Sequence, residues 1–362
     1  MAVKLAKPIN YRSVANITAL DFQDIMENLN VCKDFAVAIS GGPDSLALAL
    51  LAVQYSKANN FKFTAISIDH SLRPESKEEI KWIKALMRRY KIKFVSIKLK
   101  DKNPNSNIMA YARERRYDLL TQYCKRSKIP YLLTAHHLDD EIENFLMRLI
   151  RGSGIKGLSS SSPTYKHRRS GIKIVRPLLS FSKKSLIKYL SIYKQNYIID
   201  PTNKDKRFDR SRIRVLTTKL ISEGLNKSRF SNVLDNLKKA ESAIQSSVAE
   251  YGKSLICVRG RSSLAINIKD FISIPEEIQF RLIFKIIEHV GKKKQKPRAK
   301  SILSLIQKLS KRDFKNMNIH SCTFSIKGKE IIITLENSNL EKKYKKQQFN
   351  SFTKRGISDL FT

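Results

Sequence analysis

The sequence has few cysteines and no long apolar run. Its four cysteines, Cys32, Cys124, Cys257 and Cys322, lie far apart, and no two of them form a C-x-x-C pair. A disulfide scaffold, a zinc ribbon and a cysteine-ligated iron–sulfur cluster are therefore unsupported. The longest apolar run, from Leu46 to Val53, is far shorter than a membrane helix requires. The N-terminus also lacks a signal-peptide core, so these absences predict a soluble protein of the reducing cytoplasm.

Acidic residues are also scarce. The 362-residue chain has 70 Lys and Arg but only 32 Asp and Glu, so its formal net charge is +38. Such an excess destabilises a compact fold through self-repulsion unless a polyanion screens it. Nucleic acid is the first candidate partner, and an anionic membrane surface is the second. A Lys-rich genome composition would explain part of the excess, but not the shortage of acids.

Short apolar runs alternate with helical patterns along the first half of the chain. Strands are predicted at 35–39, 63–68, 93–97 and 131–135, and the helices that follow them at 43–55, 78–89, 108–125 and 139–151. Alternation of this kind implies right-handed crossovers and an α/β fold, with a doubly wound, mostly parallel sheet covered on both faces. Ligands bind such sheets beyond the carboxyl ends of the strands.

A change of pattern near residue 223 predicts a second domain. Before it, a Gly- and Ser-rich break at 152–171 is expected to be a mobile loop, followed by a strand at 172–175 and a helix at 183–193. After it, helices are expected at 230–251, 277–290 and 300–309, and strands at 255–258, 264–268, 323–326 and 331–335. The predicted divisions are an N-terminal extension (1–34), a main domain (35–222), a smaller α+β domain (223–340) and a polar tail (341–362).

The turn after the first predicted strand contains the most informative residues. Ser40-Gly41-Gly42-Pro43-Asp44-Ser45 follows this strand and opens a helix. Glycines let the backbone approach an anion closely, and a helix N-terminus directs unpaired amides at it. The spacing is neither that of a Walker A loop, whose lysine is absent, nor G-x-G-x-x-G. An ordinary capped turn is the alternative interpretation.

This loop resembles the S-G-G-x-D-S signature of the PP-loop ATP pyrophosphatase superfamily. Members of that superfamily cleave ATP between the α- and β-phosphates, adenylate an oxygen of the substrate and let a nucleophile displace AMP. The resemblance implies that residues 40–45 bind ATP. It also implies that Asp44 helps to hold the Mg²⁺ that neutralises the leaving pyrophosphate.

Further segments resemble one family, the tRNA(Ile)-lysidine synthetases. They run in order over about residues 35–220: Asp69-His-Ser-Leu-Arg-Pro74, Ala112-Arg-Glu-Arg-Arg-Tyr117, Thr134-Ala-His-His-Leu-Asp-Asp-Glu-Ile-Glu-Asn144, Leu149-Ile-Arg-Gly-Ser-Gly154, Val175-Arg-Pro-Leu178 and Asp200 to Arg214. The C-terminal half matches more weakly. Asn144 and Ser211 depart from the family pattern, but neither departure removes an acid, a base or a phosphate-loop residue.

The resemblance implies a reaction in two steps. ATP adenylates the carbon-2 oxygen of the wobble cytidine in the isoleucine tRNA with a CAU anticodon. The ε-amine of free L-lysine then attacks carbon-2 and releases AMP, which leaves lysidine in the tRNA. Residues 35–222 would form the catalytic domain and residues 223–340 would recognise the tRNA. The family also suggests a homodimer, and it involves no membrane.

The same resemblance gives roles to individual side chains. Asp140 and Glu143, three residues apart on one helix face, would bind lysine and act in catalysis, although acids are also common in a first helical turn. Arg113 would act at the nucleotide or the reacting centre, whereas a surface basic residue is the alternative. Asp69 and His136 would line the ATP site, and the alternatives are a loop cap and a structural histidine.

A basic run close to the end of the main domain suggests RNA contact. Arginines surround Phe208 at positions Arg207, Arg210, Arg212 and Arg214. Arginines with an interleaved aromatic residue can hold RNA phosphates and stack on bases, and these four would bind the tRNA. A solvated helix face is the alternative.

Three rival hypotheses remain open. A metal cluster of His136, His137, Asp139 and Asp140 is disfavoured because adjacent histidines usually point apart and no third histidine has ligand spacing. A PP-loop tRNA thiolase is disfavoured because such enzymes typically use paired or catalytic cysteines. A non-catalytic RNA-binding protein on the same fold is the third alternative, against which the intact loop and acids argue.

Overall fold

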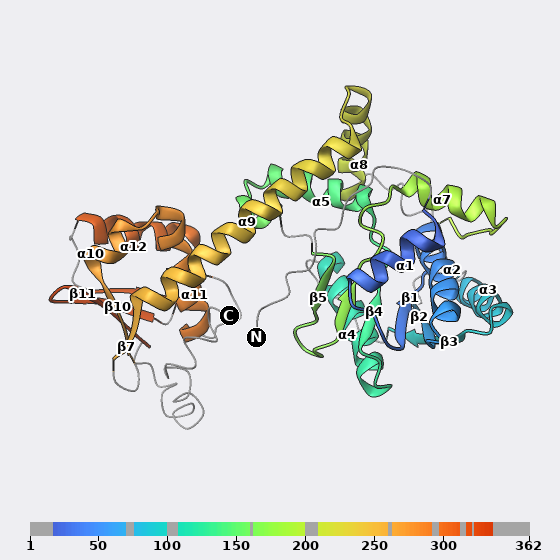
Figure 1. Cartoon of the computed structure of the whole chain (residues 1–362), viewed down its shortest axis with the longest axis horizontal. Coiled ribbons are helices and arrows are strands. Elements are labelled where there is room, and N and C mark those ends of the chain that lie inside the picture. The colour runs from blue at the N-terminus through green and yellow to red at the C-terminus, as the bar shows by residue number, and fades with distance from the viewer. Residues whose placement is uncertain are drawn as a thin grey trace. The chain divides into compact units, whose positions relative to one another are not determined.

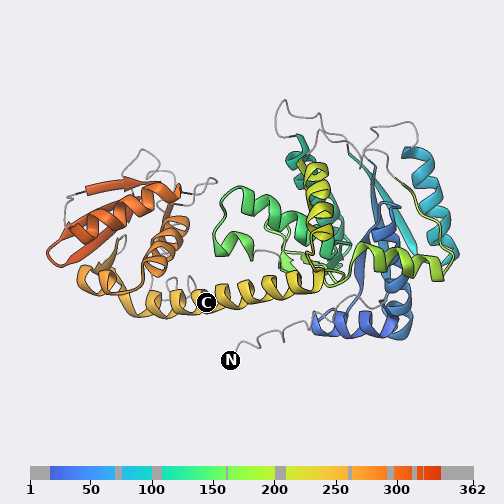
Figure 2. The same ribbon diagram turned by 90° about the horizontal axis from the view of Figure 1, so that it is seen from above.

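The computed structural model describes residues 17–69, 76–99, 108–159, 162–199, 209–259, 263–291, 297–311, 316–320 and 322–335 (Figure 1). The chain forms two compact units, Met1–Lys238 and Lys239–Thr362. They divide inside helix α9 (Lys227–Leu255), which is continuous in Figure 2. The functional boundary expected near residue 223 stays a prediction.

The first unit is built on a mostly parallel sheet in the order β3-β2-β1-β4-β6-β5. Its strands are β1 (Phe35–Ala38), β2 (Phe63–Asp69), β3 (Lys93–Lys98), β4 (Tyr131–Leu133), β5 (Thr164–Lys166) and β6 (Lys173–Val175). All neighbours run parallel except β5, which pairs antiparallel with β6. The predicted doubly wound α/β fold is confirmed.

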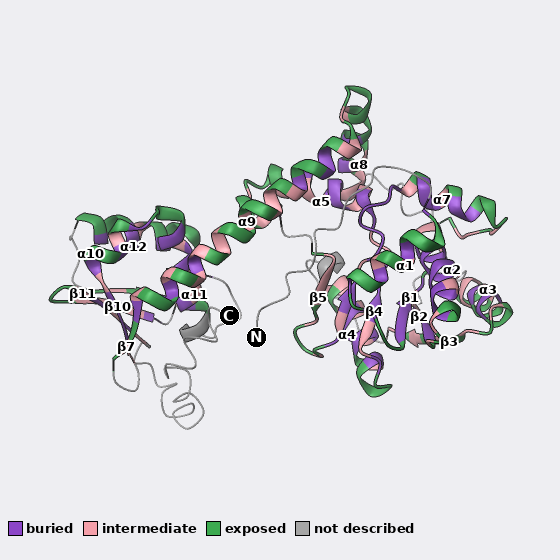
Figure 3. Ribbon diagram, in the orientation of Figure 1, coloured by how far each residue is buried: buried purple, intermediate pink, exposed green. Residues whose placement is uncertain are grey.

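Helices cover both faces of this sheet. The helices of the unit that precede α9 are α1 (Ala19–Asn28), α2 (Pro43–Ala58), α3 (Ser76–Arg89), α4 (Ile108–Arg126), α5 (Leu138–Ile150), α6 (Ile155–Leu158), α7 (Lys183–Ile192) and α8 (Asp209–Ser222). Phe35 and Val37 of β1 pack with α1, α2, α3 and α7, whereas Ala36 packs with α4 on the opposite face. The apolar run from Leu46 to Val53 lies in α2 and is entirely buried, as the purple ribbon of Figure 3 shows.

Helix α1 was not predicted from the sequence, although it has a readable start signal. Thr18 and Asp21 form a capping box, in which each side chain accepts from the other residue's backbone amide. Phe22 and Met26 are fully buried in the core of the first unit. The rings of Phe22 and Tyr55 pack edge to face with their centroids 6.1 Å apart. This part of the predicted N-terminal extension is therefore integral to the packed unit.

The loop predicted at 152–171 is interrupted by regular structure. Helix α6 and strand β5 both lie within it, and Ser160 and Ser161 lie outside the described residues. Thr164 pairs with Val175, and the three-residue strand β5 exists because β6 offers it a free edge. Composition alone carries no information about that partner.

The second unit confirms the predicted α+β domain. Its sheet is antiparallel in the order β7-β8-β11-β10-β9. The elements are β7 (Ile256–Arg259), β8 (Ser263–Asn267), α10 (Ile268–Ser273), α11 (Glu276–Gly291), α12 (Ala299–Lys311), β9 (Asn316–Ile319), β10 (Cys322–Lys327) and β11 (Glu330–Leu335). Phe271, Leu282 and Phe324 are fully buried in its core. In the described part of the chain, no helix combines the length and apolar character needed to cross a bilayer.

Replacing Phe22 by Ala should destabilise the first unit by about 3–5 kcal/mol, since it empties a fully buried site. The chain has one tryptophan, Trp82, which packs against the same core, so urea unfolding followed by its fluorescence reports on this unit. Leu20→Ala on the same helix is the control, because Leu20 is 74% exposed, and its effect should stay within about 0.5 kcal/mol. Equal effects of the two substitutions would show that α1 is not anchored as described.

Candidate active site

A cavity of about 480 Å³ opens beyond the carboxyl ends of β1, β2 and β4. The strand order reverses between β1 and β4, which is where open α/β sheets bind ligands. Its wall includes the following residues singled out from the sequence: Ser40, Gly42, Asp44, Ser45, Asp69, Arg113, His136, Asp140 and Arg210. Residues far apart in the chain thus share one cavity of a size that suits a nucleotide.

The loop between β1 and α2 holds its shape through its two serines. The Ser40 amide donates to Ser45 Oγ at 3.2 Å, and the Ser45 hydroxyl donates to the Gly42 carbonyl at 3.0 Å. Gly42 is the N-cap of α2 and Pro43 follows at its first position, with no side-chain cap from the described residues. The helix N-terminus therefore presents backbone amides and a positive dipole to the cavity, which suits an anion.

Gly41 cannot be replaced by a larger residue without movement. Its φ is +81°, and a Cβ atom built there would lie 2.5 Å from Ile198 Cδ1. The Ile198 amide also donates a hydrogen bond to the Gly41 carbonyl at 2.9 Å. The segment after α7 therefore packs directly against the 40–45 loop. The left-handed backbone and the close approach both require glycine.

Asp44 lies in the first turn of α2 between His137 and Lys183. Its Oδ2 is 3.5 Å from His137 Nε2 and 3.4 Å from Lys183 Nζ. Burial would raise the pKa of Asp44, but the hydrogen bond from His137 and the charges of His137 and Lys183 lower it on balance. Asp44 Oδ1 is buried and accepts no hydrogen bond from the described residues. A hard oxygen with open lone pairs fits a Mg²⁺ ligand.

His137 caps helix α5 rather than joining a metal cluster. Its Nδ1 accepts the Asp140 amide at 3.4 Å, and its Nε2 lies 3.6 Å from Asp140 Oδ2. Burial lowers the pKa of His137, but Asp44, Asp140 and Asp139 raise it on balance. Within the described residues no group of three or more His, Cys, Asp or Glu side chains could hold a metal ion. The metal-cluster hypothesis therefore receives no support.

His136 points to a different set of partners. Arg113 Nη2 lies 3.0 Å from its Nε2, and Thr134 Oγ1 lies 3.1 Å from its Nδ1. Burial and the nearby charge of Arg176 lower the pKa of His136 to about 3, so this ring is neutral at physiological pH. Adjacent histidines thus point apart, as expected. Asp69 lines the same cavity from the end of β2.

Asp140 and Glu143 share one face of α5 but have different surroundings. Asp140 lines the cavity, whereas Glu143 faces α8, where Arg214 Nε donates to its Oε1 at 2.7 Å and Arg210 Nε lies 3.7 Å from its Oε2. Burial raises the pKa of Glu143 on balance, against the lowering effect of Arg214. Glu143 Oε2 is buried and accepts no hydrogen bond from any described residue.

The four arginines predicted to contact RNA differ in their surroundings. Arg210 and Arg214 pair with Glu143, and Arg210 also donates to Asn144 Oδ1 at 3.0 Å. Arg212 is exposed on α8, and Arg207 lies outside the described residues. Contact of these residues with tRNA stays a prediction.

Comparison with known proteins agrees with this geometry. The PP-loop domain family matches residues 15–220. The tRNA(Ile)-lysidine synthase of Wolbachia sp. subsp. Brugia malayi is 32% identical over 88% of this chain and 75% of its own length. That of Bradyrhizobium sp. (strain BTAi1) is 35% identical over 70% of this chain and 74% of its own. The chain belongs to the tRNA(Ile)-lysidine synthase family.

Among solved structures, the fold resembles the U34-tRNA thiolase NcsA from Methanococcus maripaludis with its [4Fe-4S] cluster. The TM-score is 0.52 and the sequence identity 20%, over 61% of this chain and 78% of that one. At this identity the likeness concerns the fold alone. The PP-loop fold predicted from the sequence is confirmed.

Three basic residues of this synthase were missed by the sequence analysis. Lys183 reaches Asp44, and its amide donates to Asp139 Oδ2 at 2.9 Å. Lys227 Nζ lies 2.5 Å from Asp139 Oδ1. Arg116 lines the cavity one turn after Arg113. Arg116 stands in the quoted A-R-x-x-R-Y segment and was within reach of sequence reasoning, whereas the two lysines carry no local signal.

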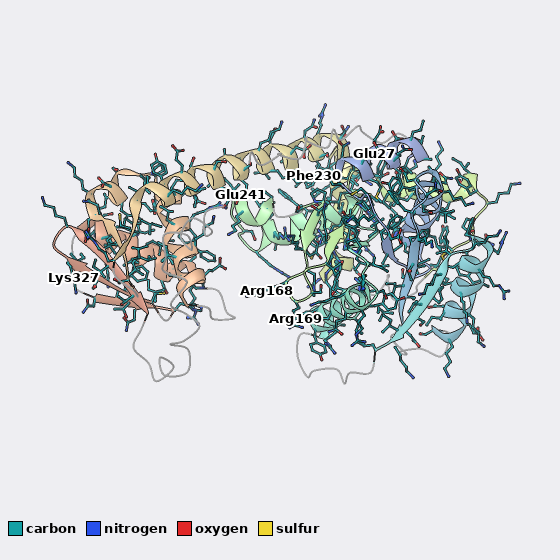
Figure 4. All side chains as sticks on the ribbon, turned by 60° about the horizontal axis from the view of Figure 1, so that its bottom comes forward. Glu27, Arg168, Arg169, Phe230, Glu241 and Lys327 are labelled. Carbon is teal, nitrogen blue, oxygen red and sulfur yellow. The ribbon has the colours of Figure 1, made fainter. Side chains whose placement is uncertain are left out.

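The first turn of α9 packs against α5 beside this site. The rings of Phe230, which is labelled in Figure 4, and Phe145 pack edge to face with their centroids 5.0 Å apart. Leu234 and Ile142 belong to the same apolar cluster. The ion pair between Lys227 and Asp139 lies at the start of the same helix. Residues 227–234 therefore help to fix the helix that carries Asp140 and Glu143.

Gly41→Ala should lower ATP affinity by more than about tenfold, because the loop must shift to relieve the contact with Ile198. Gly171→Ala is the matched control: its φ is also positive, at +76°, but its added Cβ would meet nothing within 4 Å. The control should lose about 1 kcal/mol of stability and keep its ATP affinity. Calorimetric titration with ATP separates the two, and equal affinities would contradict the role of the loop.

Proposed function

We propose that this protein uses ATP to join L-lysine to carbon-2 of the wobble cytidine in CAU-anticodon tRNA(Ile), with release of AMP and pyrophosphate. The observation that carries the proposal is the shared cavity, in which the Ser40–Ser45 loop faces Asp140. Membership in the tRNA(Ile)-lysidine synthase family supports it. The net charge of +38 suits a nucleic acid substrate.

In the first step the loop would bind the β- and γ-phosphates that leave as pyrophosphate. Amides at the start of α2 and the hydroxyl of Ser40 would supply donors, and Ser45 would hold the loop in shape. Asp44 would hold Mg²⁺ through its open Oδ1, and that ion would neutralise charge on the leaving group. Asp69 would contact the adenosine at the end of β2. Arg113 would stabilise negative charge that develops at the α-phosphate.

In the second step Asp140 and Glu143 would hold the lysine. Glu143 already contacts Arg214, so the proposed contact uses its other oxygen, Oε2, which has no hydrogen bond from the described residues. A carboxylate pair suits a substrate with two amino groups. The ε-nitrogen must be uncharged when it attacks carbon-2, because an ammonium group has no lone pair.

The thiolase alternative lacks its usual chemistry in this cavity. None of the described residues that line it is a cysteine: Cys124 and Cys322 are buried, and the exposed Cys32 and Cys257 are not part of the cavity wall. A sulfur carrier needs an accessible thiolate. A non-catalytic RNA-binding protein would have no use for a half-buried Asp44 paired with Lys183 beside a phosphate loop.

Other parts of the proposal concern assembly and location. The second unit would recognise the tRNA outside its anticodon, because the methionine tRNA has the same anticodon. Arg212 offers an exposed guanidinium on α8 for RNA, and Arg207, Arg210 and Arg214 would assist. A homodimer and a cytoplasmic location complete the proposal.

Asp44→Asn should reduce incorporation of labelled lysine into an unmodified tRNA(Ile) transcript by about 10²–10³-fold, since it removes a charge at the pyrophosphate. Asp24→Asn, which removes the same charge from the exposed face of α1, is the matched control and should be unaffected. Lysine incorporation by the Asp44→Asn protein at the control's rate would refute the assignment. AMP release that requires a sulfur donor would favour the thiolase.

Glu143→Gln should raise the KM for lysine by at least about tenfold and leave the KM for ATP within about twofold, because the substitution removes a charge from the proposed lysine contact and leaves the Ser40–Ser45 loop unchanged. Steady-state kinetics with each substrate varied in turn measures the split. Parallel increases in both KM values would instead mean that Glu143 acts by holding α8 through Arg214.

A further inference from the structure

His136, Arg113 and Thr134 form a short chain of hydrogen bonds in the cavity wall. Arg113 Nη2 lies 3.0 Å from His136 Nε2, and His136 Nδ1 lies 3.1 Å from Thr134 Oγ1. Thr134 is buried directly after β4, and its amide donates to the Val175 carbonyl at 2.9 Å. The chain thus connects a cavity arginine to the rigid sheet.

The donors in this chain determine the protonation of the ring. A guanidinium has only N–H donors, so His136 Nε2 must accept the bond from Arg113. The ring proton therefore resides on Nδ1, which donates to Thr134 Oγ1. A doubly protonated imidazole would turn an N–H toward Arg113 and break the contact. The geometry requires a neutral histidine in one tautomer.

The charges around His136 favour the same state. Arg176, Arg113 and Arg116 surround the ring, and Asp140 is the one carboxylate among its main charged neighbours in the described residues. Burial and the cation Arg176 lower the pKa of His136 to about 3. The imidazole stays uncharged across the physiological range.

Arg113 differs from Arg210 and Arg214, whose guanidinium groups both pair with Glu143. Arg113 makes no ion pair with any described carboxylate, and its guanidinium lies 5.4 Å from the centre of the Tyr117 ring. The neutral His136 ring and the face of Tyr117 orient the Arg113 guanidinium. Neither partner is an anion, so neither neutralises its positive charge.

We propose that His136 is a positioning residue that orients Arg113 toward the reacting phosphate while leaving its positive charge uncompensated. The inference rests on the role given to Arg113 in the proposed function. A carboxylate at position 136 would orient Arg113 equally well, but it would neutralise the charge that the transition state needs. Thr134 acts behind His136 by fixing the tautomer.

The tautomer can be tested without any assay of activity. The chain has six histidines, and nitrogen-15 NMR of the labelled protein, with His136→Gln used to assign the signal, reports which ring nitrogen carries the proton. The expected result is a neutral Nδ1–H ring from pH 8 to about pH 5. An Nε2–H ring, or protonation near pH 6.5, would overturn the inference.

Kinetics tests the consequence for catalysis. His136→Gln keeps a neutral acceptor and should lower kcat by no more than about tenfold, whereas His136→Glu should lower it by about 100-fold with little change in the KM for ATP. Thr134→Val should lower kcat by about threefold to tenfold, and Thr134→Ser should recover most of the loss. Equal rates for the Gln and Glu variants would contradict the need for a neutral acceptor.

A double-mutant cycle separates positioning from general structural damage. In an Arg113→Ala background, the difference in rate between the Gln and Glu variants at position 136 should fall below about threefold, because the charge of Arg113 is no longer there to neutralise. A difference that persists in that background would overturn the inference. If the unmodified protein forms no lysidine at all, the proposed function fails, and the NMR result still decides the state of His136.

Discussion

The backbone turn at residues 40–45, between β1 and α2, is the feature on which the rest of the first unit depends. Its proposed role is to bind the phosphates of ATP. Gly41 adopts a left-handed conformation under Ile198, and Gly42 leaves the start of α2 without a side-chain cap from the described residues. The helix that follows this turn anchors it, because α2 is buried along most of its length. The sheet then brings the ends of β2 and β4 to the same place, and with them the acids and arginines of the site.

The acids of the site and Arg113 have partners of different charge. Three acids of the site lie beside basic side chains: Asp44 beside Lys183 and His137, Asp139 beside Lys227, and Glu143 beside Arg214. Pairing keeps these acids ionised or oriented despite burial. Arg113 instead contacts the neutral His136. Acids are thus balanced where cationic ligands would bind, and one guanidinium keeps its charge where an anionic group would react.

The sequence predicts the elements of this fold better than their contacts. Apolar periodicity located the strands of both sheets except β5 and β9, because burial imposes that period directly. Helix α1 was missed although Thr18 and Asp21 signal its start, and β5 was missed because a three-residue strand depends on its partner. The pairing of Glu143 with Arg214 spans 71 residues and no local pattern encodes it. The different roles of the adjacent His136 and His137 can be assigned only from the side chains that each ring contacts in the folded chain.

The most direct test of the central claim follows the oxygen of the wobble cytidine. If this oxygen is adenylated and later leaves with AMP, a tRNA(Ile) transcript labelled with oxygen-18 at carbon-2 of that cytidine should yield AMP that carries one labelled atom for each lysine incorporated. Mass spectrometry of the released nucleotide measures it. Unlabelled AMP formed alongside the lysine adduct would contradict adenylation of the base.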